Sequence, residues 1–480
     1  MTLLTANPRP PAKEGAGTVH GASYRDPAGF VFTRDGVLFR QVNPAGRDDF
    51  DLLISSGLYA KLAGAGDLIA HEDVGPEHSP DGRAYRVIKP ERVHFVSYPY
   101  EWSFSQLKDA ALLTLRLQRT ALDHGMSLKD ATPYNVVFEN GRPVLIDTLS
   151  FERLKPGTPW VAYRQFCQLF LAPLALMSGV DIRLGHLLRS ELDGVPLDLA
   201  SALLPLRSRL KPGLLIHLHL HAATERRVSR RPPPTAPSGA ATSKRALGDN
   251  AVRGLIDSLE RTVRSLDWTP AGTVWADYYE ATNYTDAAFE HKRQIVSTTL
   301  ERLAPATVWD LGANDGTFSR LASQQGIPTV AFDVDPAAVE KNYRRIARGQ
   351  EKHLLPLLMD LTNPSTACGW AHQERESLVE RGPADLALAL ALVHHLAIGH
   401  NVPLGRVAEY MAAIARALVI EFVPKRDSQV QRMLATREDV FAEYRQDAFE
   451  EAFSAYFRIE EAVPVRDSER TVYVMRRLAA

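Results

Sequence analysis

In the second half of the chain, short apolar runs alternate with longer stretches in which apolar and polar residues are mixed. The apolar runs TVWDLG, PTVAFDVD, LLPLLMD, ADLALALALV and ALVIEFVP predict strands. The stretches AAFEHKRQIVSTTLERL, GTFSRLASQQG and PAAVEKNYRRIARG predict helices, the last with Pro336 in its first turn. Near-continuous apolar strands separated by helices predict a parallel sheet covered on both faces.

The first half has a different pattern. GFVFTRDGVLFRQV predicts a hairpin that turns at Asp35-Gly36, and FDLLISSGLYAKLAGAG predicts a helical stretch that ends in glycines. LFLAPLALM, interrupted by Pro173, and LALALALV (386–393) are far shorter than the ~20 residues of a membrane-spanning helix. We expect both to be buried elements, and the first half to be an α+β domain.

The length of 480 residues predicts more than one domain. Residues 1–20 are rich in Pro, Gly and Ala and are expected to be disordered. TERRVSRRPPPTAPSGAATSKRALGD has almost no large apolar residues, which is typical of a linker whose arginines are solvated. We therefore predict an α+β domain over 21–223, a linker over 224–250, and an α/β, Rossmann-like doubly wound domain over 251–480.

The composition limits the classes of function. Apolar residues make up 45%, charged residues 24%, and the net charge is −1. These values give no global indication of a nucleic-acid or membrane partner. The two cysteines, Cys167 and Cys368, are too few for a disulfide framework or a thiolate zinc site, and they suit a reducing cytoplasm. No metal is expected, and the sequence predicts no oligomeric state.

The candidate chemistry begins where the first strand of the second half ends, at WDLGANDG. In a doubly wound sheet, ligands bind at the carboxyl ends of strands. The spacing lacks the G-x-G of a dinucleotide site and the G-K-S/T of a phosphate loop. Asp310-x-Gly312-x-x-x-Gly316 resembles the first motif of class I S-adenosylmethionine-dependent methyltransferases. The resemblance covers about residues 275–480 and implies that Asp310, Gly312, Ala313, Asn314 and Gly316 form a loop that binds S-adenosylmethionine.

Two later acids extend this resemblance. Asp333 ends the second strand about 20 residues after the glycines, where a carboxylate can accept from both ribose hydroxyls, with Val334 beside it. Asp335 competes for this role, but it precedes Pro336 and suits a helix N-cap. Asp360 ends the third strand, and in the family an acid there commonly accepts from the adenine amino group. Leu361 could contact the adenine.

The fourth strand, in LALALALVHHLAI, resembles the family motif that faces the transferred methyl group. His394 and His395 lie where the acceptor should arrive, and histidine is a natural general base near pH 7. We favour His395, which is further beyond the strand, although either ring could simply pack there. Glu421, at the end of LVIEF, could hold the acceptor, fix a histidine tautomer or be structural. The resemblance implies methyl transfer to an O or N atom of an unidentified acceptor. We expect a small molecule, with sugars, lipids, natural products and proteins all left open.

Two further stretches are candidates for contact with the ligands. GWAHQERESLVERG follows the third strand and could cover the pocket, or it could be an ordinary charged helix surface. Tyr278, Tyr279 and Tyr284 precede the first helix of this domain and could lie over the cofactor, although simple packing is the alternative. NPSTACGWAHQERESLVERG, ALVHHLAIGHNVPL and LVIEFVPKRD together resemble the NoeA type of nodulation-associated methyltransferase-like proteins.

A second constellation lies in LKDATPYNVVFENGRPVLIDTLSF of the first half. Asp130, Asn135 and Asp147 resemble the catalytic loop and metal-binding acid of the protein-kinase and aminoglycoside-phosphotransferase superfamily, whose members bind magnesium-ATP. No glycine-rich phosphate loop precedes them, and no strand Lys–helix Glu pair is evident. We therefore favour a degenerate module that binds a substrate or partner. Active phosphotransfer, a hairpin with turn-forming Asp and Asn, and a wholly non-catalytic binding protein are the alternatives.

HLHLH places His217, His219 and His221 at alternate positions. On a strand, all three would share a face and could bind a metal. The surrounding GLLIHLHLHAATERR favours a helix, on which only His217 and His221 align.

Overall fold

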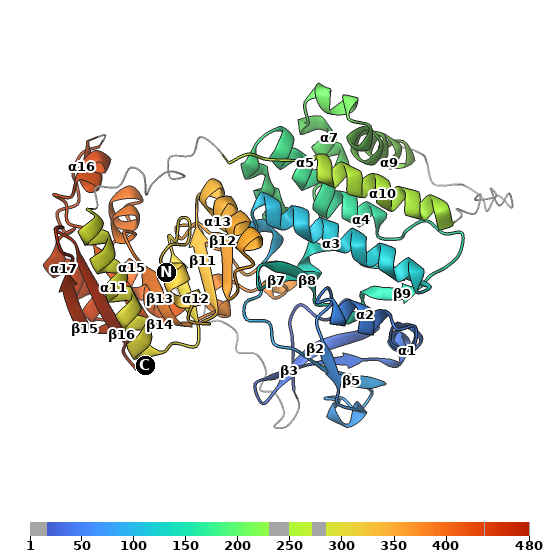
Figure 1. The fold of residues 1–480 in the computed structure, drawn as a ribbon, viewed down its shortest axis with the longest axis horizontal. Coiled ribbons are helices and arrows are strands. Elements are labelled where there is room, and N and C mark those ends of the chain that lie inside the picture. Colours follow the sequence, from blue (N-terminus) through green and yellow to red (C-terminus); the bar gives the residue numbers. More distant parts are fainter. Residues whose placement is uncertain (1–16, 230–248, 271–284, 436, 480) are drawn as a thin grey trace.

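The computed structural model describes residues 17–229, 249–270, 285–435 and 437–479 (Figure 1). A seven-stranded sheet dominates the second half. Its strands are β10 (Val308–Leu311), β11 (Thr329–Asp333), β12 (Leu354–Leu358), β13 (Ala384–Ala389), β14 (Ala415–Phe422), β15 (Phe457–Pro464) and β16 (Thr471–Arg477). The strand order is β12-β11-β10-β13-β14-β16-β15, with β16 antiparallel to both neighbours.

Successive residues of this sheet point to opposite faces, as the pleat requires. On β13, Leu386 and Leu388 pack in one apolar cluster with α11 (Asp286–Leu303) and α12 (Ser319–Ser323). Ala387 and Ala389 pack in another cluster with α15 (Leu404–Ile414) and α17 (Gln446–Ser454). The doubly wound fold is therefore confirmed. The prediction of a wholly parallel sheet is wrong, because β15 and β16 form an antiparallel hairpin at one edge.

The remaining helices of this half connect the strands. α13 (Pro336–Gly349) follows β11, and α14 (Leu378–Arg381) and α16 (Ser428–Leu434) are short. Asp335 caps α13, because its Oδ1 accepts from the backbone N–H of Ala337 at 2.8 Å. The role of N-cap predicted for Asp335 is confirmed. The helix predicted over GTFSRLASQQG is shorter than expected, since turns precede Ser319.

The first half begins with an antiparallel sheet and continues as a mostly helical region. The sheet has the order β1-β2-β3-β5-β4 and consists of β1 (Thr18–Val19), β2 (Gly29–Arg34), β3 (Val37–Val42), β4 (His71–Asp73) and β5 (Arg86–Pro90). Asp35 and Gly36 both have positive φ, +51° and +75°, so the predicted two-residue turn is confirmed. Helices α1 (Arg47–Ser55) and α2 (Leu58–Gly64) lie between β3 and β4, as the glycine-ended stretch predicts.

The helical region is built around the long helix α3 (Phe104–Asp123). Two small strand pairs follow it, β6 (Met126–Leu128) with β9 (Phe151–Arg153) and β7 (Val136–Glu139) with β8 (Arg142–Leu145). The helices after them are α4 (Tyr163–Phe166), α5 (Ala172–Gly179), α6 (Leu187–Ser190), α7 (Leu197–Leu203), α8 (Pro212–Leu214) and α9 (His221–Ser229). LFLAPLALM is buried here as a π-helical turn and α5, as expected.

Two predicted boundaries need correction. Thr18 and Val19 pair with β2, although residues 1–20 were expected to be disordered. Helix α9 continues to Ser229, inside the predicted linker, and α10 (Asp249–Ser265) packs against α3 of the first half. Arg119 of α3 donates to Asp257 at 2.5 Å and to Glu260 at 2.7 Å. Residues 251–265 therefore pack with the first half, not with the seven-stranded sheet.

The two halves share an apolar core. The ring of Phe95 lies edge-on to Trp309 of β10 and Phe332 of β11, with centroids 5.6 and 5.9 Å apart. A buried, bidentate ion pair joins Arg381 to Glu101, with N–O distances of 2.6 and 2.9 Å. These contacts fix the position of the first half against the sheet.

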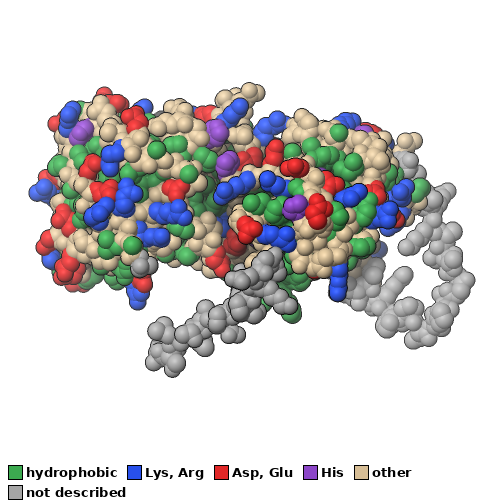
Figure 2. Space-filling model, turned by 90° about the horizontal axis from the view of Figure 1, so that it is seen from below, with side chains coloured by type: hydrophobic (Ala, Val, Ile, Leu, Met, Phe, Trp, Pro, Cys, Tyr) green, Lys and Arg blue, Asp and Glu red, His purple; other side chains and the backbone are tan. Residues whose placement is uncertain are grey.

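Figure 2 shows acidic and basic side chains interspersed over one face of the molecule, as the near-zero net charge leads one to expect. Across the described ranges, no helix combines the length and the apolar character needed to span a bilayer.

Candidate functional site

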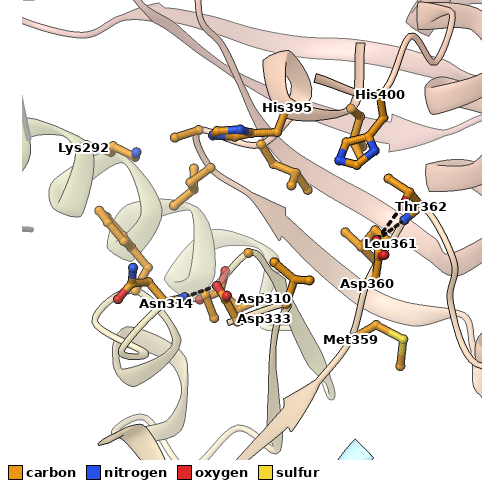
Figure 3. A pocket seen from close by; sticks show the side chains of 18 of the residues that line it. Lys292, Asp310, Asn314, Asp333, Met359, Asp360, Leu361, Thr362, His395 and His400 are labelled. Atoms are coloured by element: carbon orange, nitrogen blue, oxygen red, sulfur yellow. Dashed lines mark hydrogen bonds between the residues drawn. The ribbon is translucent and has the colours of Figure 1, made fainter. Parts of the chain in front are cut away.

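A cavity of about 230 Å³ opens at the carboxyl ends of β10, β11, β12 and β13 (Figure 3). Its apolar lining comes from Phe289, Phe318, Val334, Met359, Leu361, Leu390, Leu392 and Leu396. Its polar lining comes from Lys292, Asp310, Asn314, Asp333, Asp360, Thr362, His395 and His400. The position is the one expected for the ligand of a doubly wound sheet.

The loop after β10 forms one wall of the cavity. Gly312 has a φ of +81°, and the backbone N–H groups of Gly312 and Ala313 both donate to the carbonyl of Phe332 at 2.9 Å. This holds the loop against β11. The predicted residues Asp310, Gly312, Ala313 and Asn314 all line the cavity.

Gly316 does not line the cavity but shapes its loop. Its φ is +80°, and an added Cβ would lie 2.6 Å from Nδ2 of Asn342. A glycine is required here both by the backbone conformation and by the close approach of Asn342 and Arg320. Gly316 was predicted to bind the cofactor, and the structure places it behind the loop, where it supports the loop's conformation.

Two acids face the cavity, Asp310 buried and Asp333 partly buried. Asp310 is 2% exposed and accepts from Ser319 Oγ at 2.6 Å. Asp333 accepts from the backbone N–H groups of Asn314 at 2.7 Å and Asp335 at 2.8 Å. Burial raises the pKa of Asp310 to about 7 and that of Asp333 to about 6. The site therefore favours a ligand that carries positive charge or donates hydrogen bonds.

The end of β12 forms another part of the lining. Asp360 is exposed, and its Oδ1 accepts from the backbone N–H of Thr362 at 2.8 Å and from Oγ1 of Thr362 at 2.6 Å. Val334, which is 58% exposed, and Leu361 present apolar surface to the same cavity. Carboxylate, hydroxyl and aliphatic groups thus lie together where a flat polar ring system could be held.

The two histidines after β13 have different positions. His395 lines the cavity, and burial lowers its pKa to about 4, so that its ring is neutral at pH 7. His394 is fully buried outside the cavity lining, and within the described residues neither of its ring nitrogens has a hydrogen-bond partner. The rings lie 4.1 Å apart. Of the pair, only His395 can reach a bound molecule.

Glu421 lies under the cavity, buried in an ion pair. Its Oε2 accepts from Lys292 Nζ at 2.7 Å and from the backbone N–H of Ala391 at 2.7 Å. Both side chains are almost fully buried, and Arg470 Nη1 lies 3.8 Å from the other carboxylate oxygen. Glu421 therefore fixes the loop after β13. Neither a hydrogen bond to a histidine nor a place in the cavity lining is seen for it in the described structure.

The sequence reasoning missed Lys292, Phe289, Phe318 and His400, which all line the cavity. The ammonium of Lys292 lies 5.0 Å from the centre of the Phe318 ring. Burial of Lys292 could have been predicted from the sequence, because Lys292 lies four and eight residues before Val296 and Leu300, on the buried side of α11. Tyr278, Tyr279 and Tyr284 lie outside the described residues.

The segment after β12 does not cover the cavity. Glu374 accepts from Arg25 at 2.6 Å, and the guanidinium of Arg375 lies 4.1 Å from the centre of the Tyr134 ring. With Arg381 bound to Glu101, this segment packs against the first half and contributes no residue to the cavity lining, so of the alternatives for GWAHQERESLVERG the pocket cover is not seen.

The three polar residues singled out in the first half do converge. Asn135 Nδ2 donates to Asp130 at 3.1 Å and to Asp147 at 3.4 Å. Gln165 also donates to Asp130, at 2.7 Å, and Arg40 of β3 forms an ion pair with Asp147 at 2.6 Å. Asp147, the acid to which the resemblance assigns metal binding, is therefore paired with the guanidinium of Arg40.

The HLHLH histidines are structural. His217 hydrogen-bonds to Tyr163 and Ser258, both at 2.9 Å, and His219 to Ser201 and Ser208, both at 2.8 Å. The segment is helical, as predicted. Among the residues that the structure describes, no cluster of His, Cys, Asp or Glu could hold a metal.

The sheet order, with one antiparallel strand before the edge, and the cavity over its parallel strands define the Rossmann-like fold of the class I methyltransferases. No protein-family model matches the chain. It is 37% identical over 479 residues to the nodulation protein NoeA of Rhizobium meliloti (strain 1021), covering 99% of this chain and 98% of that protein. The chain therefore belongs to the NoeA family, which confirms the resemblance seen in the sequence.

The similarity to solved structures is remote. The N-methyltransferase NodS from Bradyrhizobium japonicum WM9 aligns with 40% of this chain and 99% of its own, at 17% identity and a TM-score of 0.29. The bifunctional kinase-methyltransferase WbdD aligns with 40% of each chain, at 17% identity and a TM-score of 0.28. Magnesium protoporphyrin IX methyltransferase from Synechocystis PCC 6803 aligns with 42% of this chain and 91% of its own, at 14% identity and a TM-score of 0.30.

Proposed function

We propose that this protein transfers a methyl group from S-adenosylmethionine to an O or N atom of a small-molecule acceptor. The observation that carries the proposal is the pair of acids, the buried Asp310 and the partly buried Asp333, that face one cavity at the ends of neighbouring parallel strands. Two carboxylates in one cavity suit a ligand that is both cationic and rich in hydroxyl groups.

The residues present fit this cofactor. Asp333 is held by two backbone N–H groups, and a carboxylate with two oxygens can still accept from ribose hydroxyls. Asp360 and Thr362 could hydrogen-bond to the adenine edge, while Val334 and Leu361 could pack on its faces. Asp310 lies where a carboxylate favours the positive charge of the amino-acid part or of the sulfonium. When bound, the cofactor supplies an electrophilic methyl group.

The protein's part in the transfer is to orient the acceptor and take up its proton. His395 is neutral at pH 7 and lines the cavity, so one of its nitrogens can accept a proton or a hydrogen bond. A pKa of about 4 makes it a weak base, which suits an acceptor whose proton leaves as the new bond forms. Glu421 acts by positioning the loop that carries His395, through the N–H of Ala391.

The test is turnover. S-adenosylhomocysteine release is measured with the wild-type protein against panels of sugars, amines and phenols, and then with Asp333→Asn and His395→Ala. We expect at least one acceptor class to stimulate release, with Asp333→Asn raising the KM for the cofactor and His395→Ala lowering kcat. Cofactor binding without release for any acceptor class would contradict the proposed transfer and favour a non-catalytic binding protein.

The convergence of Asp130, Asn135 and Asp147 supports a second candidate, phosphotransfer from magnesium-ATP at the first half. The ion pair between Arg40 and Asp147 opposes it, since a metal would have to displace the guanidinium. Calorimetry with magnesium-ATP separates the two. We expect no binding by the wild type, and ATP turnover that is lost in Asp130→Ala would establish the second candidate.

A further inference from the structure

The surface around α7 carries six exposed aliphatic side chains. They are Leu199, Leu203, Leu206, Leu210, Ile216 and Leu220, referred to here as the leucine face. Leu206 and Leu210 are 77% and 84% exposed, the two largest values among the large hydrophobic residues of the described chain. Clusters of exposed aliphatic residues are uncommon on monomeric proteins and usually mark an interaction site.

The elements that carry the leucine face pack against one another. They are α7, the 3-10 segment Leu206–Leu210 and the π-helical turn Leu215–Leu220, at the upper right of Figure 1 beside the label α7. Leu199 and Leu203 are four residues apart on one helix, as are Ile216 and Leu220, so each pair lies on one side of its element.

A buried histidine holds these elements in place. His219 of the π-helical turn hydrogen-bonds to Ser201 of α7 through Nδ1 and to Ser208 of the 3-10 segment through Nε2. Burial lowers the pKa of His219, so the ring is neutral and can donate to one hydroxyl and accept from the other. The leucines are therefore displayed on a fixed scaffold.

The charges on this surface are mostly basic, with the exposed Asp198 in the first turn of α7 as an acid beside Leu199. From Leu199 to Leu220 the sequence contains no Asp or Glu. Arg207, Arg209 and Lys211 are exposed and alternate with the most exposed leucines, and Ser208 between the arginines points inward. Exposed aliphatic side chains with an excess of cations are the combination found on helices that lie at the surface of an anionic membrane.

We propose that the leucine face binds the surface of an anionic lipid bilayer. The leucines would enter the interface, and the three cations would contact lipid phosphates with their aliphatic stems in the apolar layer. This revises the expectation of no membrane partner, which rested on total charge and on the lack of a spanning segment. Neither quantity is sensitive to a local surface of this kind.

Other occupants fit less well. In a twofold dimer through this face, two predominantly basic surfaces would approach each other, and an excess of like charge in an interface is unfavourable. Protein interfaces are enriched in aromatic residues at their centres, whereas this face is purely aliphatic. The linker segment 230–248 contains Leu247 as its single large aliphatic residue, so its composition offers little apolar surface to cover six side chains.

The experiment is co-sedimentation of the full-length protein with vesicles of phosphatidylcholine alone or mixed with phosphatidylglycerol. The variants are Leu206→Ser/Leu210→Ser and Arg207→Gln/Arg209→Gln, all at exposed positions. Val440→Ser, at a residue 66% exposed on the other half, is the matched control.

We expect binding to the anionic vesicles, with an affinity that falls as salt is added. Arg207→Gln/Arg209→Gln should lower that affinity by about fivefold for each neutralised cation. The leucine variant should lose at least about tenfold in affinity, and Val440→Ser should bind like the wild type. Absence of binding to anionic vesicles overturns the proposal, as does equal binding by wild type and both face variants. A dimer that the leucine variant converts to a monomer, without vesicle binding, also overturns it and makes the face a self-association surface.

Discussion

Replacing Glu421 with glutamine should destabilise the second half strongly, although the change removes only one charge. The carboxylate is fully buried and pairs with Lys292 Nζ at 2.7 Å, while the Lys292 side chain is 3% exposed. The same oxygen accepts from the N–H of Ala391. Glu421→Gln leaves an ammonium group buried without its counter-charge.

The magnitude follows from this burial. Removing one partner of a buried ion pair costs about 3–5 kcal/mol. Burial already lowers the pKa of Lys292, so the amine can lose its proton when the carboxylate is removed. Because a neutral amine is less costly to bury than an ammonium group, we expect a loss in the free energy of unfolding near the lower limit, about 3 kcal/mol. The double variant Lys292→Met/Glu421→Gln removes both charges and keeps an acceptor for Ala391, so it should recover to within about 1–2 kcal/mol of the wild type.

The assay is urea unfolding followed by far-UV circular dichroism, with the midpoint shift converted through the m-value. Glu409→Gln is the matched control, because Glu409 pairs with Arg406 at 2.7 Å on the surface and should cost less than about 0.5 kcal/mol. Equal losses for Glu421→Gln and Glu409→Gln would refute the reasoning. So would a double variant less stable than the single one.

Three further outcomes follow from the site. With pKa values of about 7 and 6, Asp310 and Asp333 must both lose a proton to hold the ligand as carboxylates, so cofactor affinity measured by calorimetry should fall about tenfold per unit between pH 7 and pH 6 and about a hundredfold per unit below pH 6; a flat profile contradicts this. Gly316→Ala should lower the free energy of unfolding in urea more than the control Gly326→Ala, because Gly326 has the same φ of +80° but open space where a Cβ would lie. The backbone strain common to both variants is about 1–2 kcal/mol. Equal losses would exclude crowding by Asn342. His394→Phe should leave the free energy of unfolding in urea within about 1 kcal/mol of the wild type or raise it, because the buried ring has no hydrogen-bond partner among the described residues. A large loss of stability would contradict this and imply that the ring nitrogens are hydrogen-bonded.

The place of the loop after β10 at the cavity could be predicted from the sequence because its determinants are local. Asp310, Gly312 and Asp333 each stand at the end of an apolar strand, and parallel strands bring such ends together. The same logic placed Asp360 and His395 at the cavity. The end of a strand can be recognised in a single sequence, and the parallel topology brings the carboxyl ends of neighbouring strands together at one edge of the sheet.

The pairings across the fold could not be predicted in this way. Lys292 and Glu421 are 129 residues apart, and no periodicity links a lysine on the buried stripe of a helix to one particular acid. Arg40 reaches Asp147 because β3 lies over the loop after β8, and a sheet in the first half had to be placed before that contact could be seen. GWAHQERESLVERG, for which a pocket cover was one alternative, packs elsewhere because Arg381 forms a buried ion pair with Glu101 in the other half.

The most direct test of the central claim is calorimetric titration of S-adenosylmethionine into the wild type, Asp333→Asn and Asp385→Asn. Asp385 lies at the opposite end of the sheet, where it accepts from Ala306 and pairs with Arg416, so its variant controls for loss of an acid. The account predicts binding by the wild type and Asp385→Asn, and a loss of about tenfold or more in Asp333→Asn. A folded wild type that does not bind, or equal affinity in Asp333→Asn, would contradict the assignment of this cavity to the cofactor.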